Sequence, residues 1–463
     1  MKKIIVQKFG GTSVSSARKR VEAAQRVLEA RRSGYAPVVV VSAMGRRGDP
    51  YATDTFIDLA RSIDPEREME KRELDLLLAC GELVSIAVMA HTIRCVGDVD
   101  TIALPGGQAG IVTDREFGNA RILRVDPAYI HDCIRRGQIV IVAGFQGISE
   151  PGAKGEHGAV TTLGRGGSDA TAVALGAALN APVEIYTDVE GVLTADPNVV
   201  PDARVLKTIS HAEICEMAHL GAKVVQARAA VLARRHNVRV WVKSPSSESA
   251  GTEVRRLEPA PGRKTSVAGV SQVPVAYVAV HVPDERASRL IELETYRAMQ
   301  EANVAIHFTS VTTNKIEFVV ARDAMPDVQQ VLDGLTVFDA EESPSGQRRV
   351  YILRPNPPSP RFRAQQRLAR NLGTPVPVPI TISGRSSVVS IVAGNMPSPA
   401  GVMSAVFRAL RQHDIHILQV ADSTYSVSCL VPEEDALTAV RALHAMMMDK
   451  VQAGEWTLTD QSA

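Results

Sequence analysis

Three short segments place glycines beside a cation or a carboxylate, where an apolar run gives way to a turn. Lys8–Ser13, with the sequence KFGGTS, follows the apolar run Ile4–Val6. Gly164–Asp169 and Thr187–Pro197 lie in the same kind of place further along the chain. Glycines there let backbone N–H groups approach a phosphate closely, and a lysine adds a mobile positive charge. A Gly-Gly pair alone is also typical of an ordinary turn, so the recurrence is what predicts a phosphate-binding site.

The charged residues near these turns each have an ordinary structural role as well. Asp169 opens an alanine-rich stretch and could simply cap a helix. Asp188 lies in an Asp-Val-Glu-Gly sequence that is also typical of a turn. Lys8 could be a solvated surface lysine and Glu82 an exposed helix residue. The residues by themselves therefore leave both interpretations open.

The composition is that of a globular protein. Hydrophobic residues make up 45% and charged residues 22% of the 463 residues, a length that predicts two to four domains. A net charge of +1 and 4% aromatic residues give no reason to expect nucleic acid or membrane partners. No apolar run suits a signal peptide or a bilayer-spanning helix. The five cysteines form no CxxC pair, so we expect no metal site of protein ligands, and free thiols in a reducing cytoplasm.

The first half of the chain alternates strand and helix patterns. Nearly continuous Val/Ile runs predict strands that are buried on both faces of a parallel sheet. These runs are Ile4–Val6, Val38–Val41, Val99–Leu104, Ile139–Ala143, Val183–Tyr186 and Val238–Val242. Helical patterns lie between them, for example at Leu74–Ile93 and Asp169–Leu179. The alternation predicts an α/β sandwich through about Lys243, with ligands at the carboxyl ends of its strands.

The second half changes character after a segment at 246–261 that is rich in Ser, Pro, Gly and Glu and is typical of a linker. Two similar units follow it. The first has the order strand, helix, strand, strand, helix between Tyr277 and Leu332, and the second repeats it between Val388 and Met446. This order, with room for a last strand, predicts two ferredoxin-like βαββαβ units.

Eight short segments occur in a fixed order along the chain. They are Lys8–Ser13, Val41–Gly45 (VSAMG), Gly81-Glu82, Gln108–Gly110, Val142–Gly147 (VAGFQG), Leu163–Asp169 (LGRGGSD), Thr187–Pro197 (TDVEGVLTADP) and Gly221–Val224 (GAKV). In this order they resemble the monofunctional bacterial aspartokinases, which are amino acid kinases with tandem ACT domains. Met44–Asp54 is most similar to the diaminopimelate-sensitive type found in bacilli. The resemblance implies an αβα sandwich with a mainly parallel sheet, followed by two ferredoxin-like ACT domains.

The resemblance also implies domain boundaries. We expect a catalytic domain at 1–245, a linker at 246–264, a first ACT-like unit at 265–342, a basic insert at 343–385 and a second ACT-like unit at 386–454. The last strand of the first unit is expected at 455–460. The insert is rich in Pro and Arg and has no Asp or Glu. It is interpreted either as a solvated flexible segment or as a surface that docks to an acidic partner or to the kinase lobe.

The activity implied by the resemblance is transfer of the γ-phosphoryl group of MgATP to the β-carboxylate of L-aspartate. The product, 4-phospho-L-aspartate, is the first intermediate toward diaminopimelate, lysine, threonine and methionine. Because a carboxylate is already ionised at neutral pH, no general base is needed. The enzyme must align two anions and neutralise the developing charge. The implied catalytic residues are Lys8, Asp169 and Lys223, and the implied cofactors are ATP and Mg²⁺.

Two sets of binding residues follow from the same resemblance. The ATP-binding set is Lys8, Gly10, Gly11, Ser13, Thr187, Asp188, Leu193, Asp196, Asn198 and Lys223. The substrate-binding set is Ser42, Thr53, Glu82, Arg165, Gly166, Gly167 and Ser168. In this set Arg165 and Ser168 would hold the α-carboxylate of aspartate, and Glu82 its α-ammonium. Many relatives carry Tyr at position 193 and Arg at 198, so altered nucleotide contacts are expected there.

Control and assembly are implied by the paired ACT-like units. Such units associate edge to edge and bind amino acids at their interface, so a homodimer or higher oligomer is expected. The implied effector-binding residues are Asn303, Gly401, Gln419 and Asp422. Lysine, threonine and diaminopimelate are all candidate effectors, and the bacillus-type motif favours diaminopimelate.

Two other functions fit part of the pattern. An amino acid kinase that phosphorylates glutamate, acetylglutamate or carbamate would share Lys8, the glycine turns and Asp188, but would lack paired ACT units. An amino-acid sensor with a decayed kinase domain is the other, for which Leu193 and Asn198 are the only hints.

Overall fold

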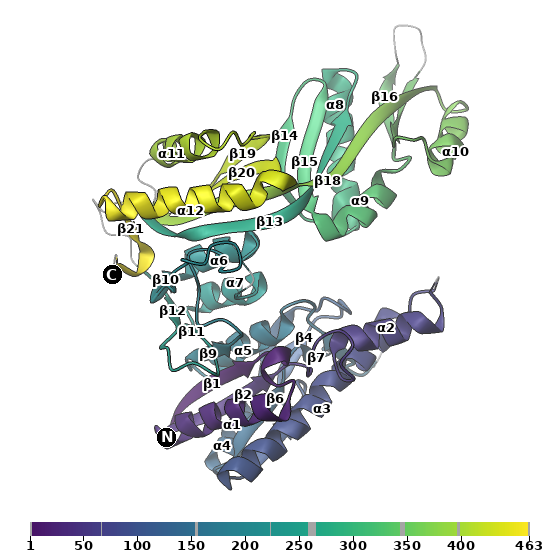
Figure 1. The fold of residues 1–463 in the computed structure, drawn as a ribbon. Helices are drawn as coiled ribbons and strands as arrows, with labels where there is room; N and C mark the ends of the chain where they lie inside the picture. The colour runs from purple at the N-terminus through teal and green to yellow at the C-terminus, as the bar shows by residue number, and fades with distance from the viewer. Residues whose placement is uncertain are drawn as a thin grey trace. The chain divides into compact units, whose positions relative to one another are not determined.

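The computed structural model describes residues 2–65, 67–152, 156–222, 224–257, 265–342, 348–395 and 399–461, and it divides into two compact units. The first unit comprises 1–269, 392–397 and 447–463. The second comprises 270–391 and 398–446 (Figure 1). The first unit therefore takes its residues from three separate parts of the chain.

An eight-stranded sheet forms the centre of the first unit, in the order β10-β12-β11-β9-β1-β2-β6-β3. The strands are β1 (Lys3–Phe9), β2 (Tyr35–Val41), β3 (Thr101–Leu104), β6 (Ile139–Ala143), β9 (Val183–Tyr186), β10 (Thr208–Ser210), β11 (Val240–Lys243) and β12 (Thr252–Arg255). Neighbouring strands are parallel except for β11 and β12. The Val/Ile runs of β2 and β6 are buried along their length, as predicted for strands covered on both faces.

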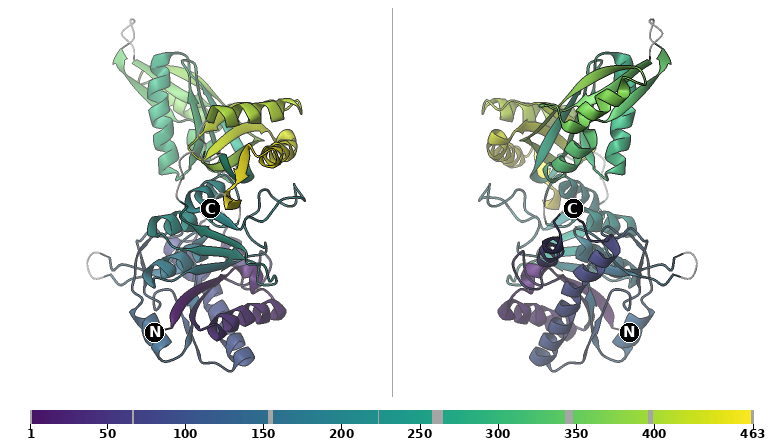
Figure 2. Two further views of the ribbon diagram at one scale, coloured as in Figure 1. Left: turned by 90° about the vertical axis from the view of Figure 1, so that its left-hand side faces the viewer. Right: turned by 90° about the vertical axis from the view of Figure 1, so that its right-hand side faces the viewer.

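Helices cover both faces of this sheet (Figure 2). Val39 and Val41 of β2 pack with α1 (Ala17–Arg32) and α3 (Lys71–Gly97) in one core. Val38 and Val40 point the other way, into a core with α4 (Ala128–Arg135), α5 (Gly167–Ala178), α6 (His211–His219) and α7 (Ala227–His236). Because side chains alternate along a strand, Val6 and Lys8 of β1 face α5, whereas Gln7 and Phe9 face α1.

The remaining elements of the kinase part lie around this core. A short helix α2 (Thr53–Ile63) follows β2, and a 3₁₀ turn η1 (Gly11–Ser13) follows β1. A separate four-stranded sheet has the order β5-β4-β7-β8. Its strands are β4 (Ile111–Thr113), β5 (Ile122–Val125), β7 (Gln146–Ser149) and β8 (Val160–Thr162). β8 leads directly into the glycine-rich turn at 163–169.

The predicted linker starts later than expected. Within 246–264, Thr252–Arg255 forms β12, which pairs with β11 and β10 in the kinase sheet. The Ser- and Glu-rich composition concealed this strand, whose Thr252 and Val254 are buried while Glu253 and Arg255 are partly exposed. Residues 258–264 lie outside the described part of the chain.

A second sheet has the order β14-β15-β13-β18-β17-β16, with β20 on β18, β19 on β20 and β21 on β13. Its elements are β13 (Thr265–His281), α8 (Glu285–Glu301), β14 (Ile306–Val311), β15 (Lys315–Ala321), α9 (Met325–Leu332), β16 (Thr336–Glu342), β17 (Arg348–Arg354), α10 (Pro360–Ala369), β18 (Thr374–Asn395), α11 (Pro399–Arg411), β19 (Gln419–Asp422), β20 (Ser426–Pro432), α12 (Ala436–Gln452) and β21 (Trp456–Leu458). Both predicted βαββα orders are present. The apolar sequence Ile415-His416-Ile417 favours the second strand of the second unit, but this strand, β19, begins later, at Gln419.

Two long strands link the two ferredoxin-like halves of this sheet. Gln272 of β13 donates to Ser387 of β18 at 3.4 Å, and His281 lies 3.5 Å from Thr381. Because residue numbers rise on one strand while they fall on the other, β13 and β18 are antiparallel. β18 thereby takes the place beside β13 that a fourth ferredoxin-like strand would occupy, and it then begins the second half. A strand, β21, is present within 455–460, where the last strand of the first ACT-like unit was expected. It pairs in parallel with Thr265–Val267, whereas β15 of that unit pairs with Val275–His281 of the same long strand.

The arginine-rich insert is not a flexible segment where the structure describes it, from 348 to 385. β17 pairs with β16 and, in parallel, with β18, and α10 crosses between β17 and β18. Phe362 and Ala369 of α10 pack with Val350 and Ile352 in a small separate core. Ser359 caps the helix by accepting a hydrogen bond from the Phe362 N–H at 2.9 Å. These few apolar positions are enough to form a core, although arginine and proline dominate the composition of the segment.

The C-terminal end of the chain is bound to the kinase part of the first unit. The Thr459 hydroxyl donates to Glu213 of α6 at 2.9 Å, and the Lys207 N–H donates to Asp460 at 3.0 Å. Glu213 is buried and also closes a capping box with Ser210 at the start of α6. An added side chain at Gly394 of β18 would begin 2.3 Å from a Glu213 oxygen. One buried carboxyl group on α6 thus contacts two distant segments of the chain, at Gly394 and at Thr459.

One helix, α3, differs from the expectation that no segment could span a bilayer. Among the described residues it is long and apolar enough by length and composition, although 50% of its most apolar window is buried inside the protein. Asp75 and Glu82 lie within this helix and are fully buried. A helix that buries its own carboxylates among backbone groups is typical of a protein core.

The small core under α10 makes a prediction about stability. Phe362→Ala should lower the opening free energy of α10 and β17 by about 3 kcal/mol, because it removes a buried aromatic side chain. Leu368→Ala, at a position that is 58% exposed on the same helix, should change it by less than about 0.5 kcal/mol. Native-state hydrogen exchange measures both values. Unprotected α10 amides in the unsubstituted protein would instead support a flexible insert.

Candidate active site

Lys8 and Asp169, two of the predicted catalytic residues, form a nearly buried ion pair. The Lys8 Nζ atom lies 2.6 Å from Asp169 Oδ1, and the two side chains are 12% and 8% exposed. Lys8 is on the α5 face of the central strand β1, and Asp169 is in the first turn of α5. Gly10 keeps the space beside the ammonium group open, since an added Cβ would lie 3.3 Å from Nζ. The pair therefore sits where the carboxyl end of β1 meets the start of a helix.

The glycine turn after β1 packs against the loop after β2. An added Cβ at Gly11 would lie 2.4 Å from the Ala43 carbonyl oxygen, so only glycine fits there. The Gly45 N–H donates to the Gly11 carbonyl at 3.1 Å, and the Ser42 N–H donates to Phe9 at 3.2 Å. These contacts bring the predicted phosphate turn and the VSAMG segment together at one edge of the sheet.

Glu82 is a buried carboxyl group without a cationic partner among the described residues. It is 1% exposed, and its Oε1 atom accepts a hydrogen bond from the Ala43 N–H at 2.9 Å. Its Oε2 atom is buried and has no hydrogen-bond partner. Burial raises the pKa of Glu82 to about 8, although the bond from Ala43 acts in the opposite direction. An ammonium group placed beside Oε2 would satisfy this atom and favour the ionised form.

In the turn at 163–169, the Arg165 side chain is exposed to solvent, whereas the residues at the end of the turn are buried. Gly164 and Gly166 have positive φ angles of 70° and 76°, and these sharp turns leave Arg165 exposed. Ser168 and Asp169 are buried, and an added Cβ at Gly144, just after β6, would lie 2.7 Å from Ser168. Within the described residues, no ion pair or hydrogen bond engages the Arg165 guanidinium. This leaves its planar set of donors free for a carboxylate.

Asp188 follows β9 and faces a cation that the sequence analysis did not single out. Arg46, from the loop after β2, lies 3.4 Å from Asp188, and both side chains are exposed. The Thr187 hydroxyl also donates to Asp188 at 3.2 Å. Arg46 directly follows the VSAMG segment, and this position could have indicated from the sequence that it lies near the site. This ion pair joins the predicted nucleotide turn to the loop that also contacts Gly11 and Glu82.

No described contact links the other predicted nucleotide-binding residues to Lys8. Both the backbone and side-chain nitrogens of Asn198 donate to Asp196 at 2.9 Å, so this carboxylate is engaged within its own turn. Leu193 forms an isolated bridge with Val205. Ser13 is buried in η1, and Thr53 is half-buried at the start of α2. Lys223 lies outside the described residues.

The predicted effector residues lie in the second unit. Asn303 follows α8 with a positive φ of 55°, and Gly401 is exposed in the first turns of α11. Gln419 and Asp422 are the two ends of β19, where they pair with Leu430 and Val427 of β20. No described contact joins these residues into one site.

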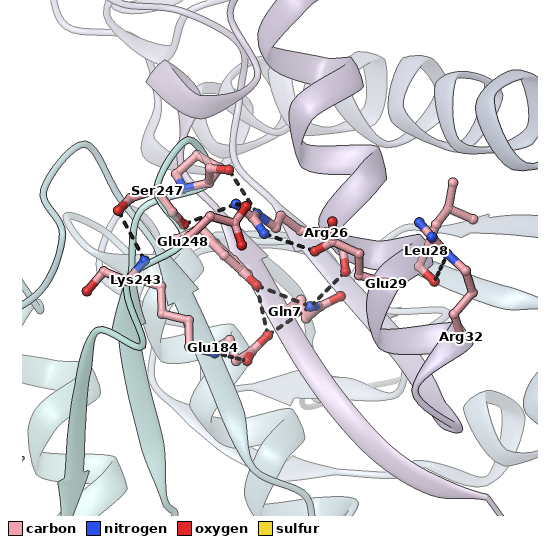
Figure 3. Close-up of polar contacts among 12 residues, drawn as sticks. Gln7, Arg26, Leu28, Glu29, Arg32, Glu184, Lys243, Ser247 and Glu248 are labelled. Carbon is pink, nitrogen blue, oxygen red and sulfur yellow. Dashed lines mark hydrogen bonds and ion pairs between the residues drawn. The ribbon is translucent and has the colours of Figure 1, made fainter.

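A buried polar network on the opposite face of β1 fixes the strands that carry the site (Figure 3). Glu184 of β9 accepts hydrogen bonds from Gln7 at 2.8 Å, Tyr186 at 3.0 Å and Lys243 at 2.6 Å. Burial, with the nearby charge of Glu184, raises the pKa of Tyr186. Arg26 of α1 closes the network through Glu29 and the 245–248 loop. Because these bonds join β1, β9 and β11, they fix where Lys8 and Asp188 leave the sheet.

Comparisons with known proteins agree with this geometry. Residues 3–244 match the model of the amino acid kinase family, and residues 389–447 match that of the ACT domain. The chain is 36% identical to aspartokinase 1 of Bacillus subtilis over 450 residues, which cover 96% of this chain and 98% of that protein. The chain belongs to the aspartokinase family. It is also 36% identical to an aspartokinase of Mycolicibacterium smegmatis over 455 residues, covering 95% of each protein.

The fold of this aspartokinase is also that of solved relatives. It matches aspartokinase III of E. coli, solved in complex with aspartate and ADP, with a TM-score of 0.69 and 22% identity. The match covers 96% of this chain and 100% of that structure. The predicted fold class and the family resemblance are therefore confirmed.

The raised pKa of Glu82 makes a prediction that needs no ligand. The folded value of about 8 lies above the unfolded value of about 4.3, so ionising Glu82 costs stability. The protonated Glu82 carboxyl group contributes to the stability of the folded protein. This contribution is fully present below about pH 4.3 and is lost as the pH rises to 8. At pH 8, Glu82→Gln should therefore raise the free energy of unfolding by an amount on the order of 5 kcal/mol, since each unit of pKa difference corresponds to about 1.4 kcal/mol.

Thermal unfolding of both proteins between pH 4 and pH 9 measures this effect. The gain from Glu82→Gln should shrink steadily as the pH falls, because the wild-type carboxyl group becomes neutral like the amide. A gain that did not change with pH would show that Glu82 is not titrating in this range.

Proposed function

We propose that this aspartokinase transfers the γ-phosphoryl group of ATP to the β-carboxylate of L-aspartate. The observation that carries the proposal is the half-satisfied, buried Glu82 carboxyl group. Burying a carboxylate without a cationic partner is unfavourable, and a bound ligand could supply the missing cation. The α-ammonium of aspartate would bind at Oε2, and Arg165 with Ser168 would bind its α-carboxylate. The β-carboxylate is then the one group left to face the Lys8 side of the site.

In this proposal Lys8 neutralises charge on the phosphoryl group as it moves. The Asp169 carboxylate holds the ammonium by a 2.6 Å contact, so its position is set before substrates bind. The attacking carboxylate is already ionised, so no side chain needs to remove a proton. Lys223, which lies outside the described residues, would add a second cation. Gly10, Gly11 and Ser13 would give backbone and hydroxyl donors to the phosphates.

Nucleotide and Mg²⁺ would enter from the side of Thr187 and Asp188. Among the described residues, no group of three or more His, Cys, Asp or Glu could hold a metal ion. Mg²⁺ usually keeps several waters and binds through one or two carboxylates and substrate phosphates, which fits a site with Asp188 alone. When bound, the ion would neutralise phosphate charge. Arg46, now paired with Asp188, is placed to contact the same phosphates, whereas the Asp196–Asn198 turn would contribute through its backbone.

We further propose that the ACT-like units bind a feedback amino acid and join copies of the chain into a homodimer or higher oligomer. Asn303, Gly401, Gln419 and Asp422 are the proposed effector residues, and diaminopimelate, lysine and threonine are the candidates. A cytoplasmic location is in keeping with five cysteines that are all free thiols.

A coupled assay of ADP release with a panel of amino acids tests the proposed reaction. Turnover should require L-aspartate, and hydroxylamine should trap the acyl phosphate as a hydroxamate. Equal turnover with glutamate or acetylglutamate would reject aspartate as the substrate. Binding of amino acids without any turnover would instead point to a sensor with an inactive kinase domain.

Two substitutions separate chemistry from binding. Lys8→Ala should lower kcat by about 100-fold or more, since preorganised charge acts mainly in the transition state. Arg165→Ala should mainly raise KM for aspartate, because its contact exists in the ground and transition states alike. Steady-state kinetics with both substrates varied measures both effects. A near-normal kcat for Lys8→Ala would make this lysine structural.

Regulation is tested with Gly401→Val, which places a bulky side chain at the exposed start of α11. Inhibition by lysine, threonine or diaminopimelate, tested singly and in pairs, should weaken while the uninhibited rate stays the same. Coupling between such sites is commonly about 1–3 kcal/mol, so a shift of fivefold or more in the inhibitor concentration is expected. Unchanged inhibition that is purely competitive with aspartate would place the effector at the active site instead.

A further inference from the structure

Helix α3 carries two buried carboxylates on one face. Asp75 and Glu82 are seven residues apart, which is close to two full helical turns, so their side chains point the same way about 10 Å apart along the axis. Both are at most 1% exposed. Glu82 faces the loop after β2, whereas Asp75 faces the strand that leads into the Arg165 turn. One rigid helix therefore contacts both ends of the proposed aspartate site.

Asp75 binds the strand that leads into the Arg165 turn and also the 118–119 segment, which packs beside Gly164 of the turn. Its carboxylate accepts hydrogen bonds from the N–H of Thr162 at 2.7 Å and from the hydroxyl of Thr162 at 2.6 Å. It also accepts from the Gly118 N–H at 3.0 Å. Thr162 is the last residue of β8, three residues before Arg165. The carboxylate thus fixes the point from which the turn departs.

Arg228 of α7 holds the same two segments from the other side. Its guanidinium donates to the Ala120 carbonyl at 3.2 Å, to the Asn119 side chain at 2.5 Å and to the Leu163 carbonyl. Gln226, two residues earlier, abuts Gly166 so closely that an added Cβ there would lie 2.4 Å from it. The turn is therefore held at 162–163 by two charged groups and at Gly166 by the start of α7.

The hydrogen bonds of both side chains, Asp75 and Arg228, are made to neutral groups. Every described partner of Asp75 is a backbone N–H or a hydroxyl, and every described partner of Arg228 is a carbonyl or amide oxygen. Burial and the like charge of Arg121 lower the pKa of Arg228, whereas the nearby charge of Asp114 acts in the opposite direction. Asp75 is fully buried and has no cationic partner among the described residues. Burying a carboxylate in this way is costly, so the arrangement at Asp75 is a poor way to gain stability. Charge-assisted hydrogen bonds are, however, short and directional, which suits a role in fixing geometry.

We infer that Asp75 and Arg228 are positioning residues that hold the Arg165 turn at a fixed distance from Glu82 and so set the affinity for aspartate. This inference rests on the proposed roles of Arg165 and Glu82. Neither residue touches the substrate; each acts through the backbone of 162–163. Since Arg165 binds one end of aspartate and Glu82 the other, a shifted turn loses one of the two contacts.

The test compares Asp75→Asn with the wild type in steady-state kinetics. An amide accepts with one oxygen only and turns an N–H group toward the remaining donors, so the clamp on Thr162 is lost. KM for aspartate should rise about 10-fold or more, because displacements near 1 Å at such sites cost up to about 100-fold. KM for ATP and kcat should stay within about threefold. Hydrogen exchange at 163–166 should become faster, which reports the loosened turn without an activity measurement.

A second arm asks whether Asp75 acts through Arg165. In an Arg165→Ala background, Asp75→Asn should change KM for aspartate by less than about twofold, because the contact it positions is already gone. Equal effects in the two backgrounds would overturn the inference. Arg228→Lys, which keeps the charge but loses the planar fork, and Thr162→Val carry the same test if Asp75→Asn does not fold.

Asp339→Asn is the matched control. Asp339 is a buried aspartate of β16 that pairs with Arg286 at 2.6 Å, far from the turn in sequence and in the other unit. This control should lose stability without any change in KM for aspartate. A similar rise in its KM would assign the effect to general destabilisation and overturn the inference. Aspartate-dependent turnover by the wild type tests the proposed function separately. If the wild type is active and Asp75→Asn leaves KM for aspartate unchanged, the positioning role of Asp75 is rejected while the proposed function stands.

Discussion

The ion pair between Lys8 and Asp169 joins the central strand of the first unit to the helix behind it, and the proposed site is arranged around it. Its 2.6 Å contact depends on two features of the parallel sheet. Strand alternation turns Lys8 toward α5, and the glycine turns at 10–11 and 164–167 bring the strand and the helix start close together. The network of Gln7, Glu184 and Lys243 on the opposite face then prevents these strands from shifting. A mobile lysine is thereby converted into a fixed positive charge.

Glu82 shows the opposite use of burial. Lys8 has a counter-charge in Asp169, whereas Glu82 has only one backbone donor and a pKa raised to about 8. A site that binds an amino acid benefits from this contrast, since the ligand itself brings the missing cation. Selectivity for a free α-ammonium group then follows from the cost of leaving a buried carboxyl group half satisfied. An acetylated amine could not supply that charge.

Much of the fold could be predicted from sequence because strand burial and turn chemistry are local. The Val/Ile runs located six strands of the kinase sheet, and KFGGTS and LGRGGSD located the ion pair. What the sequence did not show was pairing at a distance. The contact of Arg46 with Asp188 and the clamp of Asp75 on Thr162 join residues 142 and 87 positions apart. Composition also misled: β12 lies in a Ser- and Glu-rich stretch, and α10 in an Arg- and Pro-rich one, because a few buried positions outweigh many polar ones.

The first unit is completed by residues from the far end of the chain. Glu213 of α6 binds Thr459, and β21 pairs with the start of β13, so the last 17 residues belong to the same compact unit as the first strand. During synthesis the N-terminal sheet emerges hundreds of residues before its closing segment. Contacts of such high sequence separation form slowly because the loop-closure entropy must be overcome first. The contacts of Glu213 with Thr459 and of Lys207 with Asp460 can therefore form only after the intervening second unit has been synthesised.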